Sequence, residues 1–350
     1  MDKHRKALEL AGHAGCILLK NGAEIFRVQE TMTRILCAYG VTDNNVYVIS
    51  NGIFATEGEG TEHALSLVRH VPLGGVNLSR IDAVNAVSPT YANELKMSYF
   101  AHRLENVMRQ CGYKLSGVLN GIDLKRYDPA ADSHITANYS KDDMAGKSAD
   151  KAALQRMMGL REEPYTPIVA IVSRLVSHKG LDLVCEVLHD MMELPLQMVI
   201  LGKGDRKYEE FFQWAAQQYS GRMAVRLDYN EELSMAIYAG ADLFLMPSKS
   251  EPCGLSQMIA MRYGTVPIVR LTGGLKDSVP AYNPTTGTGL GFTFGSITPG
   301  DLLGAIDRGL EVYENDRPNW IGLMERGMTT DFSWDQSATA YEKVYSQVIR

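Results

Sequence analysis

Residues 165–270 alternate between short apolar strands and amphipathic helices, and this alternation restricts the fold more than any other feature. Helical patterns separate the apolar runs at 207–219, 231–239 and 254–263. Short β-branched runs separated by helices of ten or more residues predict a parallel, doubly wound sheet covered by helices on both faces. The predicted strands are 167–172, 196–201, 223–227, 242–246 and 266–269.

Polar and glycine-rich residues follow each predicted strand. The five segments are 173–174, 202–205, 228–230, 247–254 and 272–274. Ligands of open parallel sheets bind at the carboxyl ends of the strands. The sequence therefore predicts one binding site, assembled from these five loops.

Charge and hydropathy exclude several classes of protein. The 350 residues correspond to roughly two domains. A net charge of −6 argues against a general nucleic-acid binder. No apolar run is long enough for a membrane span, and the charged first residues do not form a signal peptide. The five scattered cysteines favour reduced thiols in a cytoplasm over disulfides or a zinc site, so no metal and no cofactor are expected.

The loop after the first strand carries two cations, Arg174 and Lys179. A loop of this length can bring both onto one diphosphate, with arginine as a fork and lysine as a point charge. The alternative is a pair of solvated surface cations. The segment 201–205 (LGKGD) lacks a complete phosphate-loop motif and predicts only a tight turn that lets a ligand approach the backbone.

The segment 247–257 (PSKSEPCGLSQ) is more specific. We expect a helix to begin at Gly254, so that the backbone N–H groups of Gly254, Leu255 and Ser256 could hold a phosphate. Glu251 could then accept hydrogen bonds from sugar hydroxyls. The alternative is that Glu251 only caps this helix. Cys253 is expected to be a packing residue, because no histidine is nearby in the sequence.

The first 85 residues give a different pattern. A 3.6-residue period predicts helix over 1–40, and the runs 46–50 and 53–56 predict a hairpin with a turn at Asn51-Gly52. The segment 57–60 reads as a polar loop. No residue of this region has the spacing of a catalytic or metal-binding motif.

Over about residues 86–350 the chain resembles the bacterial glycogen synthase and starch synthase family. The motifs stand in that family's order, and together they are very specific. They are VSPTYA (87–92), LSGVLNGID (115–123), VSRLVSHKGLDL (172–183), LGKGD (201–205), PSKSEPCGLSQ (247–257), TGGLKDSV (272–279) and DFSW (331–334).

The resemblance implies the C-terminal domain of a glycosyltransferase-B fold and a hexosyltransferase that moves glucose, with retention, from ADP-glucose to the non-reducing end of an α-1,4-glucan. It assigns Arg174, Lys179 and Glu251 to catalysis, the two cations at the ADP diphosphate and Glu251 at the donor glucose. It places Tyr229 beside the adenosine, and Gly254, Leu255 and Ser256 at the phosphates. Many retaining relatives carry a second glutamate at the position of Ile259, which this family's pattern also allows.

Residues 1–85 resemble instead the cytoplasmic N-terminal region of the threonine/serine exporter family, through the segments 21–31, 38–41, 51–56 and 68–85. The resemblances together predict four parts. These are an exporter-like α+β segment (1–85), the end of a first glycosyltransferase domain (86–119), a nucleotide-sugar-binding α/β domain (120–330) and a C-terminal crossover helix (331–350). They imply a chain fused or assembled from two incomplete proteins, with its join near 83–87.

Three functions remain open at this point. The first is the glucosyl transfer that the resemblance implies. A retaining enzyme of two domains closes both around its donor, and most of the first domain has no counterpart here, so the alternative is a non-catalytic ADP or ADP-glucose binder. The third is a fragment of an amino-acid exporter. We also expect self-association through uncovered apolar surface on residues 91–107 and on the last helix.

Overall fold

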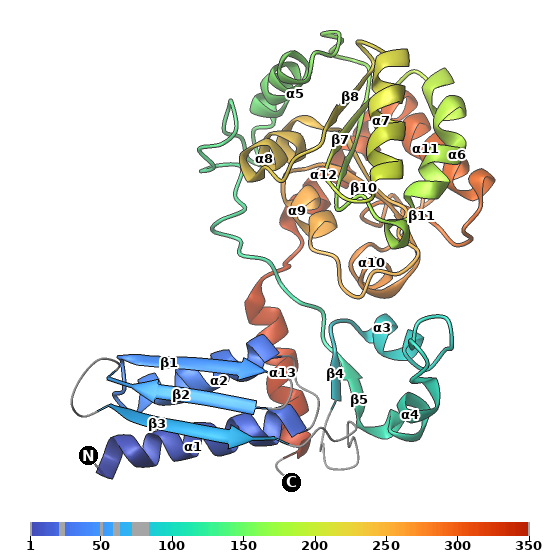
Figure 1. Ribbon diagram of the computed structural model, residues 1–350. Coiled ribbons are helices and arrows are strands. Elements are labelled where there is room, and N and C mark those ends of the chain that lie inside the picture. The colour runs from blue at the N-terminus through green and yellow to red at the C-terminus, as the bar shows by residue number, and fades with distance from the viewer. Residues whose placement is uncertain (1, 21–24, 50–51, 59–63, 72–83, 349–350) are drawn as a thin grey trace. The chain divides into compact units, whose positions relative to one another are not determined.

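The structure is a computed structural model that describes residues 2–20, 25–49, 52–58, 64–71 and 84–348 (Figure 1). The chain forms two compact units, Met1–Asp82 and Ala83–Arg350. No helix among the described residues is long and apolar enough to cross a membrane.

The first unit is a small α+β fold, as predicted. Two helices, α1 (Asp2–Lys20) and α2 (Ile25–Ala38), precede an antiparallel sheet of β1 (Asn44–Ile49), β2 (Gly52–Glu57) and β3 (Leu65–His70) in the order β1-β2-β3. Its core joins the helices to alternate strand residues, since a strand turns every second side chain to the same face. The buried members include Ala11, Val28, Met32, Leu36, Val46, Val48, Ile53 and Ala55.

The hairpin of this unit differs in detail from the prediction. Gly52 was expected in the turn, but it opens β2 and pairs with Ile49 of β1. The pairing makes Gly52 part of the strand ladder and not of the turn. Asn51 and residues 59–60 of the predicted polar loop 57–60 lie outside the described residues, while Glu57 ends β2.

The second unit is built on six parallel strands. They are β6 (Ile168–Val172), β7 (Gln197–Leu201), β8 (Met223–Arg226), β9 (Leu243–Met246), β10 (Val266–Arg270) and β11 (Phe292–Phe294). The five predicted strands are confirmed; β11 was not predicted. The strand order is β11-β10-β9-β6-β7-β8. Successive strands are added on one side of β6 up to β8 and then, from β9 onward, on its other side, so the strand order reverses between β6 and β9. Such a reversal opens a crevice at the carboxyl ends of the two strands.

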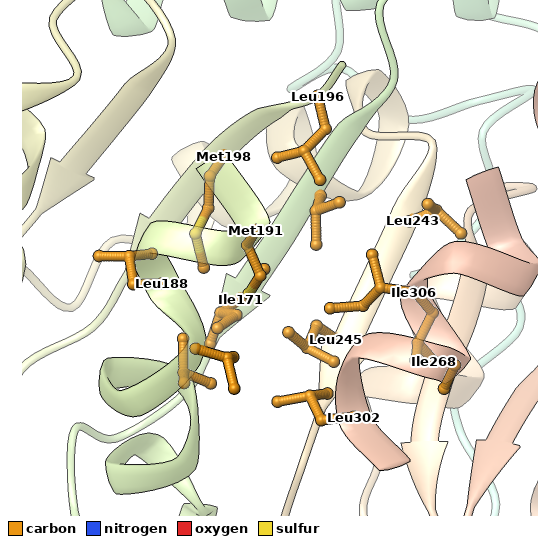
Figure 2. Close-up of a cluster of buried hydrophobic side chains, with 14 of the residues drawn as sticks. Ile171, Leu188, Met191, Leu196, Met198, Leu243, Leu245, Ile268, Leu302 and Ile306 are labelled. Atoms are coloured by element: carbon orange, nitrogen blue, oxygen red, sulfur yellow. The ribbon is translucent and has the colours of Figure 1, made fainter. Parts of the chain in front are cut away.

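Helices cover both faces of this sheet, as a doubly wound fold requires (Figure 1). One face carries α6 (Leu181–Glu193), α7 (Arg206–Gln218) and α11 (Pro299–Asn315), and the other carries α5 (Ala145–Met158), α8 (Glu231–Gly240) and α9 (Ser256–Arg262). Figure 2 shows the first core, where Ile171, Leu245 and Ile268 of the sheet meet Leu188 and Ile306 of the helices. Most residues of these strands are apolar, because both faces of the sheet are covered by helices.

A smaller part of the second unit surrounds a two-stranded parallel sheet, β4 (Val84–Ala86) and β5 (Leu115–Gly117). It also contains α3 (Pro89–Glu94) and α4 (Glu105–Gln110). The helix α12 (Arg317–Thr329) completes the α/β domain, and the predicted last helix is present as α13 (Trp334–Val348). Ser337 of α13 donates a hydrogen bond of 2.6 Å to the carbonyl of Leu119.

Candidate functional site

A cavity of about 490 Å³ lies at the carboxyl ends of the parallel strands. Residues from the loops after β6, β7 and β8 line it, together with Met246 at the end of β9. Four of the seven residues predicted for the site take part: Arg174, Lys179, Tyr229 and Ser256. The cavity therefore sits at the reversal of strand order, where open parallel sheets bind ligands.

The two cations reach this cavity from one short loop. Arg174 follows β6, and Lys179 ends a single 3-10 turn at Ser177–Lys179. Gly180 then takes a φ of +72°, and a Cβ atom there would lie 1.9 Å from the carbonyl oxygen of Pro247. The loop of the cations is thus packed directly against the loop that carries Glu251.

Glu251 is buried, and its carboxylate is held by two donors. Its Oε2 atom accepts hydrogen bonds from Lys179 Nζ at 2.6 Å and from Ser248 Oγ at 3.0 Å. It does not cap α9, because the cap position of that helix is Leu255 and no side chain bonds there. The helix-cap alternative is therefore wrong. Glu251 adjoins the cavity through Lys179 and is not part of its lining.

The start of α9 is two residues later than predicted. The helix begins at Ser256, while Gly254 adopts a left-handed φ of +71°. A Cβ atom at Gly254 would lie 2.5 Å from Oε1 of Gln257, so the position favours glycine for both reasons. Gly254 and Leu255 do not line the cavity; Ser256 is the member of this predicted trio that does.

The glycines of the LGKGD loop pack against the neighbouring loop. A Cβ atom at Gly202 would lie 1.8 Å from the carbonyl oxygen of Ser173, and one at Gly204 would lie 2.3 Å from that of Leu175. Gly202 also lines the cavity, so the predicted approach of a ligand to this backbone stays a prediction.

The backbone of Glu251 is also held by contacts with the start of another helix, which the sequence analysis did not predict. Gly274 N donates to the Glu251 carbonyl at 3.0 Å, and a Cβ atom at Gly273 would lie 2.0 Å from the same oxygen. Both glycines belong to α10 (Gly273–Ser278), and Glu94 of α3 accepts hydrogen bonds from Thr272 Oγ1 at 2.9 Å and Gly273 N at 3.0 Å. Thr90 joins α3 to Asp277 of the same helix.

The sequence analysis missed three further residues of the site. Arg126 comes from a distant part of the chain, while Glu231 and Arg270 lie within two residues of predicted loops. Arg126 and Glu231 form an ion pair, and both line the cavity. Arg270 is buried and donates from Nε to the Ser248 carbonyl at 2.7 Å, behind the loop of Glu251. No sequence motif indicated these three residues.

Tyr229 and Cys253 differ sharply in exposure. Tyr229 is 92 % exposed beside the cavity, so its ring face is open to a ligand. Cys253 is buried, and burial raises the pKa of its thiol to about 11. A thiol with that pKa is a poor nucleophile near neutrality, which supports the packing role expected for Cys253.

Within the described part of the chain, no group of three or more histidine, cysteine or acidic side chains is arranged to hold a metal ion.

The doubly wound sheet and the position of its cavity are consistent with the C-terminal domain of a glycosyltransferase-B fold, and comparisons with known proteins support that fold. The family described as "Glycosyl transferases group 1" matches residues 159–317. The family described as "Putative threonine/serine exporter" matches residues 9–121, past the boundary expected at 85. Both resemblances found in the sequence are thus confirmed.

The curated relatives are glycogen synthases. The chain is 48% identical to the glycogen synthase of Bacillus cereus (strain Q1) over 276 residues, which is 79% of this chain and 57% of that protein. It is 47% identical to the glycogen synthase of Geobacillus thermodenitrificans (strain NG80-2) over 269 residues, or 77% of this chain and 55% of that protein. The chain thus spans a little over half the length of these relatives.

Solved structures of glycosyltransferases also resemble this chain. The catalytic domain of starch synthase IV from Arabidopsis thaliana, bound to ADP and acarbose, is 39% identical with a TM-score of 0.73, over 77% of this chain and 56% of that one. Sucrose-phosphate synthase from Thermosynechococcus elongatus is 21% identical with a TM-score of 0.53, over 78% of this chain and 59% of that one, and supports the fold alone.

Proposed function

We propose that residues 120–330 bind ADP-glucose, and that this domain, paired with a first glycosyltransferase domain, transfers glucose with retention to the non-reducing end of an α-1,4-glucan. The observation that carries the proposal is the convergence of Arg174, Lys179, Tyr229 and Ser256 on one cavity, with Glu251 bonded to Lys179. The likeness to glycogen and starch synthases supports the same donor and acceptor.

Each residue has a chemical task in this proposal. Arg174 and Lys179 neutralise the diphosphate, which carries away the negative charge when the glucosyl bond breaks. Tyr229 offers its ring to the adenine, and Ser256, with the backbone of Gly254 and Leu255, contacts the phosphates. Lys179 has three N–H donors and uses one on Glu251, so two remain for phosphate oxygens.

Glu251 acts on the sugar. Its Oε2 atom is engaged by Lys179 and Ser248, while Oε1 can accept hydrogen bonds from glucose hydroxyls. The close approach of Gly273 to the Glu251 carbonyl oxygen holds the backbone of Glu251 in place. Such positioning determines how well the donor sugar is held as its bond to phosphate breaks.

A second candidate is an ADP or ADP-glucose binder without turnover. The observation that favours it is that all the lining residues of the cavity belong to the second unit, so the cavity can form and bind a ligand within that unit. Retaining transfer needs a closed site that excludes water. The exporter match over residues 9–121 supports a third candidate, a fragment of a threonine/serine exporter. For the first two candidates we propose a cytoplasmic location, which the free cysteines support.

The test is glucan synthesis from labelled ADP-glucose, with the chain alone and with a first glycosyltransferase domain supplied in trans. The enzyme proposal predicts labelled polymer at least in the second case. A binder predicts stabilisation against heat by ADP and no polymer in either case. An exporter fragment predicts that threonine or serine binds and that ADP does not.

A further inference from the structure

A second hollow of the second unit lies away from the site described above. It has a volume of about 950 Å³, and we name it the α5–α11 cavity. Its lining residues are Ser148, Lys151, Ala152, Gln155, Glu162, Pro164, Tyr165, Tyr313, Glu314 and Arg317. Tyr165 precedes β6, so the cavity lies toward the amino ends of the strands, whereas the site of Arg174 lies at their carboxyl ends.

The floor of this cavity presents unused hydrogen-bond donors. Lys151 is buried, and its Nζ bonds to Asp242 Oδ2 at 2.8 Å and to Tyr313 Oη at 3.0 Å. An ammonium group has three N–H donors, so one remains, and the Tyr313 hydroxyl that accepts from Lys151 can still donate its own proton. Burial lowers the pKa of Lys151, but the charges of Asp242 and Tyr313 and the hydrogen bonds to both side chains together outweigh burial and raise the pKa above its ordinary value.

The rim of the cavity adds hydrogen-bond acceptors, and the lining carries equal numbers of positive and negative side chains. Glu162 and Glu314 supply two carboxylates, against the two cations Lys151 and Arg317. A lining with two charges of each sign does not select an anion such as a phosphate. Donors and acceptors side by side in a neutral lining suit hydroxyl groups, which both donate and accept.

One aromatic ring is free to receive an apolar ligand face. Tyr165 is 88 % exposed at the edge of the cavity. The ring of Tyr313 is not free, because Lys151 and Arg317 lie over it at 5.4 Å and 5.8 Å from its centroid. A tyrosine ring offers a broad apolar face with a polar end, which fits the C–H face of a pyranose.

We propose that the α5–α11 cavity binds a segment of neutral α-glucan, held against Tyr165 and hydrogen-bonded to Lys151, Tyr313 and Glu314. The choice of an α-glucan rests on the proposed function, in which this polymer is the acceptor. A second site for the same polymer raises the effective concentration of chain ends near the first without any change in the reacting residues.

The experiment is calorimetric titration of the whole chain with maltoheptaose, and separately with ADP. The wild type and Tyr165→Ala are compared with Tyr113→Ala, because Tyr113 is 84 % exposed and lines none of the cavities described. Tyr165→Ala is expected to weaken maltoheptaose by about tenfold or more, as expected for a lost aromatic contact. It should leave ADP affinity within about twofold.

The outcomes separate the two proposals. Maltoheptaose affinity that is unchanged in Tyr165→Ala, or lost equally in Tyr113→Ala, overturns the glucan site. Absence of maltoheptaose binding to the wild type overturns it too. A loss of maltoheptaose affinity in Tyr165→Ala but not in Tyr113→Ala supports the glucan site. If ADP does not bind to the wild type, the proposed donor is wrong, but this result still supports the glucan site.

Discussion

In the proposed function, Glu251 recognises the glucose of the donor and not its diphosphate. The carboxylate of Glu251 is buried and bonded to Lys179 and Ser248, so it is held in place before any ligand arrives. ADP has no sugar beyond its diphosphate and offers Glu251 nothing to hold. The contact of Glu251 with a ligand should therefore be visible only when a glucose is present.

Glu251→Gln keeps the size of the side chain and one acceptor but removes its charge. We expect ADP affinity within about twofold of the wild type and ADP-glucose weakened roughly 10- to 150-fold, the equivalent of about 1.5–3 kcal/mol for a charge-assisted hydrogen bond. Calorimetric titration with both ligands measures this. Glu232→Gln, on the exposed first turn of α8, is the control. Equal weakening of both ligands would show that Glu251 does not contact the sugar.

Gly273 is a second residue on which the site depends. Its φ of +44° and the 2.0 Å between a Cβ atom there and the Glu251 carbonyl oxygen leave no room for a side chain. Gly273→Ala should lower the free energy of unfolding by more than about 2 kcal/mol and weaken ADP-glucose, since either the strain or the clash alone is costly. Gly300→Ala is the control, because nothing lies within 4 Å of that position. Urea unfolding with equal stability in both variants would contradict the close contact.

At the scale of elements, the sequence revealed the local pattern and missed the distant contacts. The five buried strands could be predicted because each is a continuous apolar run between polar loops. The strand β11 is three residues long, too short for its period to be distinguished. The hydrogen bonds between α3 and α10 join Glu94 to residues 272 and 273, and no local motif reveals such a pairing.

The helices α5, α8 and α9 are tied together by one buried lysine. Lys147 of α5 donates to the Ala239 carbonyl at 2.9 Å, the Tyr263 carbonyl at 3.0 Å and Thr265 Oγ1 at 2.9 Å. The two carbonyls lie in the last turn of α8 and just after α9, whose first residues flank the cavity at the carboxyl ends. Burial lowers the pKa of Lys147 to about 7.

This lowered pKa predicts the pH dependence of stability. Between pH 7 and about 10.4 the unfolded chain binds a proton at Lys147 that the folded chain does not, so stability rises with pH by up to about 1.4 kcal/mol per unit. Below pH 7 Lys147 is protonated in both the folded and the unfolded chain, so its contribution to the free energy of unfolding no longer changes with pH. Urea unfolding followed by tryptophan fluorescence reports the second unit, which contains Trp214, Trp320 and Trp334. The stability of wild type relative to Lys147→Met should grow from pH 7 to pH 9; a constant difference would contradict the lowered pKa.

At the scale of the whole molecule, two units with different relatives share one chain. The exporter match continues to residue 121, so it covers the first unit and also the small sheet of the second. That small part bonds to the α/β domain through Glu94 and Thr90, which makes it a structural partner of the site and not only a connection.

Apolar side chains on this small part are exposed within the second unit. Met97, Tyr99 and Leu104 are 54 %, 63 % and 50 % exposed, and Trp334 of α13 is 50 % exposed. Contiguous apolar surface favours association. Light scattering should therefore show an average mass that rises with protein concentration, and replacing Met97 and Tyr99 by serine should reduce that rise. A mass of one chain at all concentrations would contradict the proposed association.

The central claim is that the carboxyl-end cavity binds a nucleoside diphosphate through Arg174 and Lys179, and titration of the chain with ADP and with AMP tests it most directly. We expect ADP to bind more tightly than AMP, and Arg174→Ala to weaken ADP roughly 10- to 150-fold while weakening AMP less. The control Arg206→Ala removes an exposed cation that does not line the cavity, and should change neither affinity. Equal affinity for ADP and AMP, or ADP binding unchanged in Arg174→Ala, would contradict the account.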